Sequence, residues 1–303
     1  MPVWRKLGQI YSAENVLHPK LRSHAANPLP VHMEGDVYRV FFSSRDDHNR
    51  SSVGALDFDI KRRDVLEVYN KPIFEHGPQG SFFADGVSIG NCYRADGQTF
   101  MLFMGWQAPE NAHWRGDIGK LRVSDDLDLT LCGAEPLLAS NDKDPLSLSY
   151  PWVLPARGGG YDMWYGSTIS WTSGNGEMLH VIKHATSHDG HAWERRGIAV
   201  PYSEDIAQAF SRPSVVWNND GTGQMWFSYR GSKNTPYRIG YARCMDGQTW
   251  EVALKDAGID VSPDGWDSDM IEYPFVLEHQ GERYMFYNGN GFGRTGFGLA
   301  ILT

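Results

Sequence analysis

Five short segments of this sequence repeat one pattern at nearly even intervals, and this repeat limits the fold more than any other feature. In each segment a turn leads through one or two polar residues, usually to a proline, and then into a short apolar run. The segments are AANPLPV (25–31), FADGVSI (83–89), SYPWVL (149–154), SRPSVV (211–216) and EYPFVL (272–277). Aligned at Pro28, Gly86, Pro151, Pro213 and Pro274, they are separated by 58, 65, 62 and 61 residues. Such spacing indicates five copies of one structural unit.

Each segment is followed by two further stretches that have the character of strands. The first carries a bulky apolar pair: Phe41-Phe42, Phe103-Met104, Trp164-Tyr165, Trp226-Phe227 and Phe286-Tyr287. The second is exemplified by SSVGALDF (51–58) and YRIGYARC (237–244). Units of three or four strands with a period of about 60 residues are typical of propeller blades, whose sheets bury their faces against neighbouring blades. The sequence therefore predicts an all-β fold in which residues 1–303 form a single five-bladed β-propeller domain.

The two ends of the chain complement each other in this repeat. The last unit stops at Thr303 directly after its third strand, so it has no fourth strand of its own. A strand-like stretch, VWRKLGQIY (3–11), precedes the first unit. Because an unpaired sheet edge promotes aggregation, we expect this N-terminal strand to complete the fifth blade and close the ring.

The net charge, the N-terminal residues and the cysteines indicate which molecules this protein binds and where in the cell we expect it. A formal charge of −9 argues against general affinity for nucleic acid or for an anionic membrane. The N-terminal residues contain no apolar run of the kind found in signal peptides. The cysteines Cys92, Cys132 and Cys244 lie far apart, without the spacing of a disulfide framework or a zinc site. We expect a cytoplasmic protein with buried thiols, without a metal or cofactor, and leave its oligomeric state open.

Two hairpins share the pattern D-G-x-x-W, at Asp189–Trp193 and Asp246–Trp250. This pattern resembles the Asp-box turn of sialidase-like propellers, in which the Asp accepts hydrogen bonds from backbone amides and the Trp packs between strands. The resemblance implies a mechanical role for these residues and no part in chemistry.

A propeller brings the starts of its innermost strands together on one face, around the central channel. The residues directly before the aligned positions are Asn27, Asp85, Tyr150, Arg212 and Tyr273, and those one step earlier are Ala26, Ala84, Ser149, Ser211 and Glu272. His24 lies just upstream in the first unit. Inner strands are mostly apolar, so charged residues at equivalent points of the repeat are candidates for a functional site.

The turns after the second strands, and the segment before the last inner strand, add further polar side chains. These candidates for substrate binding are Arg45, Arg50, Tyr229, Arg230, Arg238, Asp267 and Asn288. Several arginines near one axis in a protein of negative net charge suggest an anionic ligand, because the planar guanidinium suits carboxylate, phosphate or sulfate. Alternatively, the arginines pair with Asp46, Asp85, Asp267 and Glu272 and hold the blades together.

The five-unit layout, the acidic residues at inner-strand starts and the aromatic second strands resemble the five-bladed propeller glycosidases. This group contains the arabinanase, xylosidase, invertase and levansucrase families and the related mannoside phosphorylases. The chain is also similar to propeller proteins of bacterial polysaccharide gene clusters. The resemblance implies two catalytic carboxylates across the channel, and by position it assigns these roles to Asp85 and Glu272. The chain departs from the pattern at Asn27, where many of those families have an Asp, at Tyr150, and in lacking the invertase-type W-x-N-D-P-N-G start.

The favoured hypothesis is a glycosidase acting on a carbohydrate with an anionic group. Glycosidic bond cleavage needs an acid to protonate the leaving oxygen and a carboxylate to assist attack at the sugar carbon. We expect Glu272 to be the acid and Asp85 to be the base or nucleophile.

Two other hypotheses stay open. In a phosphorylase, inorganic phosphate replaces water, and His24, Arg45 and Arg212 would bind it. In a non-catalytic propeller, the same residues would bind an anionic glycan or metabolite without breaking a bond. Propellers host many functions, so the fold alone does not choose among the three.

Overall fold

The computed structural model describes residues 2–14, 16, 18–232 and 235–303, and its regular structure consists almost entirely of β-strands. The first eight strands after the N-terminal one are β2 (Ser23–His32), β3 (Val37–Arg45), β4 (Ser51–Asp59), β5 (Asp64–Val68), β6 (Gly86–Ala95), β7 (Gln98–Gln107), β8 (Arg115–Val123) and β9 (Leu129–Leu131). The next eight are β10 (Ser147–Pro155), β11 (Tyr161–Ser170), β12 (Leu179–Ser187), β13 (Glu194–Ile198), β14 (Ser211–Trp217), β15 (Gly223–Tyr229), β16 (Arg238–Cys244) and β17 (Trp250–Val252). The remaining elements are β18 (Glu272–His279), β19 (Glu282–Asn288), β20 (Phe297–Leu302), β1 (Trp4–Tyr11), the 3-10 turn η1 (Leu254–Asp256) and the short helix α1 (Asn290–Gly293).

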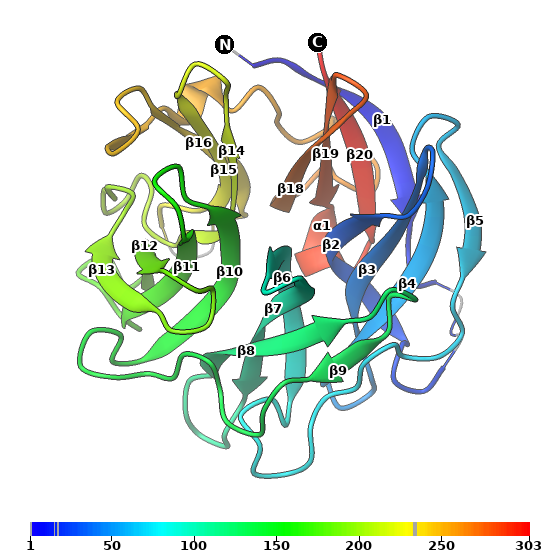
Figure 1. Cartoon of the computed structure of the whole chain (residues 1–303), viewed down its shortest axis with the longest axis horizontal. Helices are drawn as coiled ribbons and strands as arrows, with labels where there is room; N and C mark the ends of the chain where they lie inside the picture. The colour runs from blue at the N-terminus through cyan, green and yellow to red at the C-terminus, as the bar shows by residue number, and fades with distance from the viewer. Residues whose placement is uncertain (1, 15, 17, 233–234) are drawn as a thin grey trace.

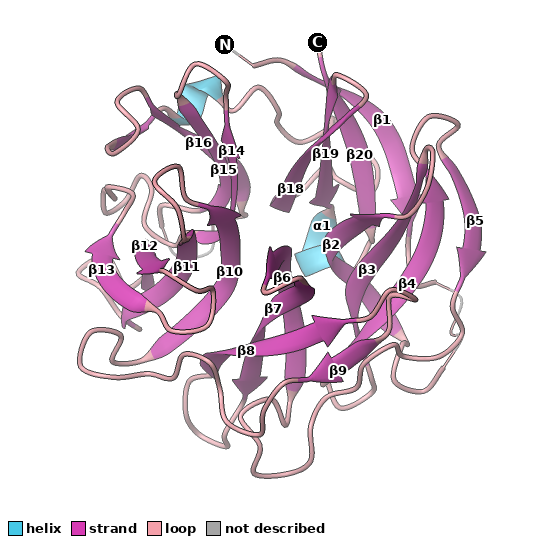
Figure 2. Cartoon of the chain, in the orientation of Figure 1, coloured by secondary structure: helices cyan, strands magenta, loops and turns pink. Residues whose placement is uncertain are grey.

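The strands form antiparallel groups of four that follow the chain. Groups 1 to 4 are β2–β5, β6–β9, β10–β13 and β14–β17, and group 5 is β18, β19, β20 and β1. A single parallel pair, Ser51 with Gly86, connects groups 1 and 2 into one larger sheet. The groups are arranged about a common centre, and β2, β6, β10, β14 and β18 lie nearest to it (Figure 1). Figure 2 shows the same arrangement, with the short helical turns η1 and α1 in connections between strands.

The N-terminal strand lies in the sheet of the last group. β1 pairs antiparallel with β20, from Trp4 opposite Leu302 to Tyr11 opposite Phe297. Beyond the strand, the Thr303 N–H donates to the Val3 carbonyl at 2.9 Å. The edge of group 5 is thus covered by a segment from the other end of the sequence (Figure 1).

Every inner strand contains a β-bulge near its start. In four of them the register shifts across the pairs Asn27-Pro28, Tyr150-Pro151, Arg212-Pro213 and Tyr273-Pro274. The first residue of each pair has a left-handed φ, between 36° and 57°, which costs energy for a side chain other than glycine. The residue after it is a proline, which has no N–H to leave unpaired in the disrupted ladder. Bulges commonly re-aim side chains beside functional sites.

The bulge corrects the sequence alignment of the second unit. In β6 the register shifts between Ile89 and Cys92, so Gly90-Asn91 corresponds to the other four pairs and Gly86 does not. Pro28, Asn91, Pro151, Pro213 and Pro274 are then separated by 63, 60, 62 and 61 residues, a more even spacing than the first alignment gives. Asp85 therefore lies five residues nearer the start of its strand than the predicted equivalence required.

Asn91 and Gly90 join β6 to the neighbouring inner strand β10. The Asn91 side chain accepts a hydrogen bond from the Val153 N–H at 2.8 Å and donates to the Val153 carbonyl at 2.9 Å. A Cβ on Gly90 would lie 2.2 Å from the Pro151 carbonyl oxygen, so only glycine allows the two backbones to approach this closely.

Gly90→Ala is expected to destabilise the protein by about 1–3 kcal/mol, because the added methyl must push two inner strands apart. Gly158→Ala is the control: a Cβ added there would have nothing within 4 Å, and the change in stability should stay within about 0.5 kcal/mol. Denaturant unfolding measures both. Equal stabilities of the two variants would contradict the close approach of β6 and β10.

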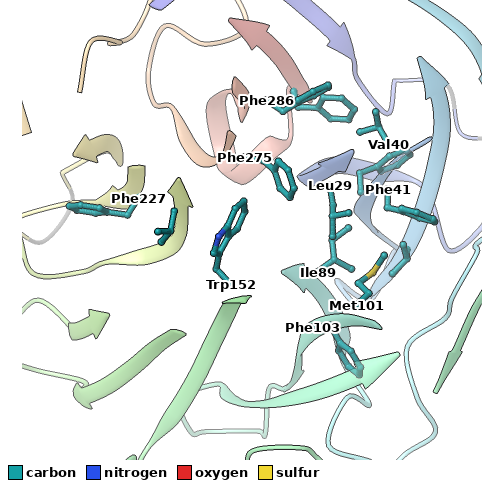
Figure 3. Close-up of a cluster of buried hydrophobic side chains, with 14 of the residues drawn as sticks. Leu29, Val40, Phe41, Ile89, Met101, Phe103, Trp152, Phe227, Phe275 and Phe286 are labelled. Atoms are coloured by element: carbon teal, nitrogen blue, oxygen red, sulfur yellow. The ribbon is translucent and has the colours of Figure 1, made fainter. Parts of the chain in front are cut away.

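The centre of the ring is filled by side chains just beyond the bulges. Trp152 and Phe275 contact each other with ring centroids 4.9 Å apart, and Leu29 and Ile89 lie beside them (Figure 3). All four side chains are buried. These side chains therefore occupy the common centre of the strand groups, next to the residues with which the inner strands begin.

The two D-G-x-x-W turns have the hydrogen bonds that the sequence predicts. The Asp189 carboxylate accepts hydrogen bonds from two backbone amides of its turn and Asp246 does the same, which confirms the Asp-box role.

The prediction that the thiols are buried is wrong for Cys132. It is exposed, because it follows the short outer strand β9 and has no neighbouring sheet to cover it. Among the described residues, no helix has the length and apolar character needed to cross a membrane.

Candidate active site

Three kinds of strand end meet on the face where the inner strands begin, which we call the mouth. Because the groups are antiparallel meanders, inner strands start there, second strands end there and third strands start there. The side chains that the structure gathers at this face we call the mouth cluster: His24, Asn27, Arg45, Tyr150, Glu177, Arg230, Tyr237, Glu272, Tyr273, Asn288 and Arg294.

Glu272 is the most unusual member of this cluster. It is the first residue of β18, its exposed fraction is 0%, and within the described part of the chain neither carboxyl oxygen has a hydrogen-bond partner. Burial raises the pKa of Glu272 well above its usual range, and the nearby positive charges of Arg45 and Arg230 only partly oppose this. A buried carboxyl group without partners is costly, and natural proteins keep such groups mainly where they serve a function.

Arginines surround this carboxyl group. Arg45 ends β3 and its guanidinium donates to the Asn49 side chain at 2.7 Å, while Arg230 follows β15. Arg294, in the connection between α1 and β20, is exposed and raises the local positive potential at His24 together with Arg45. In the described segments, Arg230 is the only one of these three arginines that forms an ion pair.

His24 is neutral in this environment. Burial lowers the pKa of His24 to about 4, and the charges of Arg45 and Arg294 act in the same direction. Its Nδ1 lies 3.0 Å from the Ser23 hydroxyl oxygen. The ring is therefore available as a neutral hydrogen-bonding group at the edge of a positively charged surface.

Three tyrosines form one wall of the mouth. The Tyr150 hydroxyl donates to the Tyr273 hydroxyl at 3.1 Å, and their rings are 5.0 Å apart. The Arg230 guanidinium lies over the Tyr237 ring, 4.9 Å from its centroid. Burial raises the pKa of all three phenols, so each remains a neutral hydrogen-bonding group at physiological pH.

Glu177 is a member of the mouth cluster that the sequence analysis missed. It precedes β12 in the connection from β11, its exposed fraction is 3%, and it forms an ion pair with Arg230 at 2.9 Å. The repeat gave no reason to single it out, because it belongs to a connection rather than to an inner strand. The only signal is its position in the loop SGNGE (173–177), directly before a third strand.

Arg212 is buried below the mouth and its bonds go to the backbone. Its two terminal nitrogens donate to the carbonyls of Ile89 and Pro28, which belong to two other inner strands. Burial lowers the pKa of Arg212 to about 9. The predicted role in substrate binding is not what these contacts show: the guanidinium joins inner strands across the centre.

The side-chain amides of Asn27 and Asn288 are buried near the start of β2. Asn27 directly precedes Pro28, whose carbonyl binds Arg212. The side-chain oxygen Oδ1 of Asn288 accepts a hydrogen bond from the backbone N–H of Asn27 at 3.2 Å. The Asn27 side-chain oxygen and the Asn288 side-chain nitrogen have no partner within the residues that the structure describes. Both predicted residues therefore lie at the mouth with free hydrogen-bonding capacity.

Asp85 lies at the rim of the mouth. One of its carboxyl oxygens accepts a hydrogen bond from the Ala108 N–H at 2.8 Å, and its carbonyl accepts from the Ser51 N–H at 3.0 Å. Ser51 in turn pairs with Arg45 across β3 and β4. Through Ser51, Asp85 is brought near Arg45. In the corrected register, however, Asp85 does not stand at the position in its unit that Glu272 has in the last one.

Two of the predicted substrate-binding residues, Arg50 and Asp267, have structural partners away from the cluster. Arg50 binds the Asp46 carboxylate at 2.8 Å, within its own loop. Asp267 accepts hydrogen bonds from Lys6 at 2.7 Å and from the Tyr287 hydroxyl at 3.0 Å, which ties β1 to β19. For these residues the alternative interpretation from the sequence, ion pairs that hold the fold together, describes the contacts.

Tyr229 and Arg238 face each other in the ladder of β15 and β16 and line a cavity of about 510 Å³ beside η1. Arg238 forms an ion pair with Asp260 at 3.2 Å. A larger cavity, of about 650 Å³, lies between groups 3 and 4 and is lined by Trp164, Trp217 and Trp250. Neither cavity is lined by a member of the mouth cluster.

No group of three or more metal-ligating side chains occurs among residues 2–14, 16, 18–232 and 235–303.

Solved structures with the same architecture place this fold in a known class. A glycoside hydrolase superimposes with a TM-score of 0.76 at 14% identity, covering 98% of this chain and 90% of the other. A protein from work on the GH130 family of mannoside phosphorylases superimposes with a TM-score of 0.73 at 14% identity, covering 99% and 93%. An endo-arabinase from Bacteroides thetaiotaomicron gives 0.64 at 12% identity, with 96% of each chain covered. The fold is that of the glycosidase-type propeller proteins.

Full-length relatives define the family within this class. The proteins named uncharacterized protein Rv1502 and uncharacterized protein MT1551, from two strains of Mycobacterium tuberculosis, are each 44% identical over 301 residues, covering 99% of both chains. The chain belongs to the family of these mycobacterial proteins. No model of a protein family matches the sequence.

Proposed function

We propose that this protein is a glycosidase-like enzyme that cleaves a glycosidic bond in a carbohydrate bearing an anionic group. We infer further that the five strand groups are the five blades of one propeller domain over residues 1–303, closed by β1, with the reaction at its mouth. The observation that carries the proposal is Glu272, a buried carboxyl group at the start of an inner strand that has no hydrogen-bond partner among the described residues. Fold neighbours that are glycoside hydrolases support the reaction class.

Glu272 fits the part of general acid. Its raised pKa extends the protonated form of the carboxyl group to higher pH than an ordinary glutamate allows, and in that form it has a proton to give to the oxygen of the leaving group. Its unpartnered oxygens leave this geometry free for a substrate. Asp85, at the rim, is the candidate that the sequence offers for the second carboxylate.

The anionic group of the substrate is inferred from charge. The charges of Arg45 and Arg230 act on the Glu272 carboxyl group, whose pKa is raised by burial, and Arg294 acts with Arg45 on His24. In the described chain, Glu177 is the one carboxylate that pairs with any of these three arginines. This local excess of positive charge stands out in a protein of net charge −9. A carboxylate, phosphate or sulfate on the sugar would balance it through charge-assisted hydrogen bonds.

Removing these charges is expected to weaken the binding of anions. Arg45→Gln and Arg294→Gln should each weaken the binding of glucuronate or inorganic phosphate roughly 10- to 100-fold, the worth of one charge-assisted hydrogen bond. Calorimetric titration at low and high salt measures this, with glucose as the neutral probe. Arg243→Gln, an exposed arginine paired with Glu251, is the control and should bind as the wild type does. Unchanged anion affinity in both mouth variants would contradict the charge argument.

Phosphorolysis is the second candidate, because neutral His24 stands next to Arg45 and Arg294, a set that could receive inorganic phosphate. Arg212, which the sequence placed in this set, is occupied with backbone carbonyls. The experiment is a screen of aryl glycosides, including glycosides of sugar acids, with and without phosphate. Turnover in phosphate-free buffer supports hydrolysis and phosphate-dependent turnover supports the phosphorylase. Binding without any product would replace both with a non-catalytic role.

A further inference from the structure

We propose that Glu177 is the second catalytic carboxylate of the mouth, the group that assists attack on the sugar while Glu272 protonates the leaving oxygen. The inference rests on the proposed function and deepens it, since it replaces Asp85 in this role. It begins from two buried carboxyl groups, on different strand groups, that each have an oxygen without a partner in the described chain: Oε2 of Glu177, and both oxygens of Glu272.

The loop that carries Glu177 is held in place by many specific bonds. The Ser173 N–H donates to the Glu177 carbonyl at 2.8 Å, and the Glu177 N–H donates to the Asn175 side chain at 3.0 Å. The buried Gln208 side chain accepts from the Asn175 amide at 2.6 Å and donates to the Met178 carbonyl at 3.4 Å. A network that fixes both sides of one acidic residue is typical of a positioned functional group.

The two oxygens of Glu177 have different surroundings. Oε1 accepts hydrogen bonds from the Met178 N–H at 2.7 Å and from the Arg230 guanidinium at 2.9 Å. Oε2 is buried and accepts no hydrogen bond from any residue that the structure describes. The Arg230 guanidinium is thus bound to one oxygen of the carboxylate, and within the described residues the other oxygen has no donor and is placed to accept a proton.

Arg230 and Tyr237 connect this carboxylate to Glu272. The Arg230 charge acts on Glu272, and its guanidinium binds Glu177 and lies over the Tyr237 ring. Tyr237 in turn is close enough to both glutamates to feel their charges. Glu177 and Glu272 therefore share one arginine, yet their surroundings differ: one carboxyl group has a cation bound to it and the other is buried without partners. Such a difference in environment separates a base from an acid.

The chemistry balances with these two groups and water. Glu177 accepts a proton from water as the water oxygen bonds to the anomeric carbon. The bond from that carbon to the leaving oxygen breaks, and the leaving oxygen takes the proton of Glu272. The products are a free sugar and an alcohol. Transfer of the proton from Glu177 to solvent, and reprotonation of Glu272, restore the starting state.

Asp85 is less suited to this part. One of its oxygens is bound by the Ala108 N–H, and the corrected register places it four residues before Ile89, the counterpart of Glu272 in β6. That separation is roughly 13 Å along an extended strand. Its place at the rim fits contact with a more distant part of the carbohydrate.

The test uses a substrate found in the glycoside screen, with an aryl leaving group, and chemical rescue. Glu177→Ala and Glu177→Gln should lower kcat roughly 10²- to 10⁴-fold, the usual contribution of a general base. Azide should restore turnover of Glu177→Ala and give a glycosyl azide, a product that a residue with a purely structural role would not yield. Glu251→Gln, at an exposed Glu–Arg pair, is the matched control and should keep wild-type kcat.

The outcomes separate this inference from the proposed function. Loss of activity in Glu272→Gln together with full activity in Glu177→Gln overturns the role of Glu177 alone. Azide rescue of Asp85→Ala, without rescue of Glu177→Ala, gives the role back to Asp85. Absence of turnover by the wild type with every glycoside overturns both proposals. Glu177→Gln, which keeps the shape of the side chain, covers the case in which Glu177→Ala does not fold.

Discussion

Glu272→Gln is expected to lower turnover roughly 10²- to 10⁴-fold, because the amide keeps the shape of the side chain but has no proton to give to a leaving group. Substrates with a good leaving group need less protonation, so the loss should be smaller for nitrophenyl glycosides than for alkyl glycosides. The wild-type rate should also fall as the pH rises through the raised pKa of Glu272, and this basic limb should vanish in the variant.

The same substitution is expected to leave the fold intact and to change how stability depends on pH. The protonated form of Glu272 is the one that the folded state favours, because its pKa is raised there by burial. Its contribution to stability is therefore complete below the ordinary pKa of 4.5 and is lost as the pH rises through the folded-state value. Glutamine cannot ionise, so the difference in Tm between variant and wild type should move in favour of the variant as the pH rises.

Kinetics over a pH series and thermal unfolding over the same series measure both effects. Glu278→Gln is the control, because Glu278 is on the same strand but is exposed and paired with Arg283. Near-normal activity in Glu272→Gln with an aryl and an alkyl glycoside would contradict the assignment of the acid. A Tm difference that is flat with pH would contradict the burial of an ionisable carboxyl group.

Arg212→Ala is expected to destabilise the protein by roughly 3–5 kcal/mol. Two inner-strand carbonyls, of Pro28 and Ile89, lose their donors, and each unsatisfied buried group costs about 1–3 kcal/mol. The side chain is only 1% exposed, so its removal also leaves a cavity at the centre of the ring. In a chain of this length the loss corresponds to a fall in Tm of roughly 6–10 °C.

Denaturant and thermal unfolding of Arg212→Ala, beside Arg243→Ala as an exposed control, measure this effect. Arg212→Lys should be intermediate, since an ammonium group is a single point of contact where the guanidinium reaches two carbonyls. A small change in Arg212→Ala, together with a large change in anion binding, would return Arg212 to the role in ligand binding that the sequence suggested.

The arrangement of the strands could be predicted from the sequence because each strand group is one copy of a sequence repeat. Proline or its counterpart marks the bulge of every inner strand, and the bulky pairs mark the second strands. The error in the second unit arose because Gly86 precedes an apolar run that resembles the other four, while the true counterpart, Asn91, uses its side chain where the others have a proline. The spacing gave a warning: the bulky pair of the second strand begins 17 residues after Gly86, but 12 or 13 residues after the aligned proline in the other four units.

The site was only partly predictable, for a physical reason. Glu272, Asn27 and Tyr150 lie at repeat positions, and the repeat itself brings such positions together. Glu177 is brought to the mouth by a loop whose path depends on Asn175 and Gln208, which is information about tertiary structure. The direction of a side chain is equally hidden: nothing in the sequence distinguishes Arg230, which faces Glu177, from Arg238, which faces Asp260.

The pairing of β1 with β20 has a consequence for how this protein is made. The sheet that begins with Glu272 takes β1 from the N-terminal part of the sequence and its other three strands from the C-terminal part, so β1 leaves the ribosome more than two hundred residues before its partner β20 does. Until β20 emerges, β1 in the nascent chain has no partner strand, and the sheet that contains Glu272 is incomplete. Chains broken off during synthesis would therefore expose an unpaired strand, which promotes aggregation.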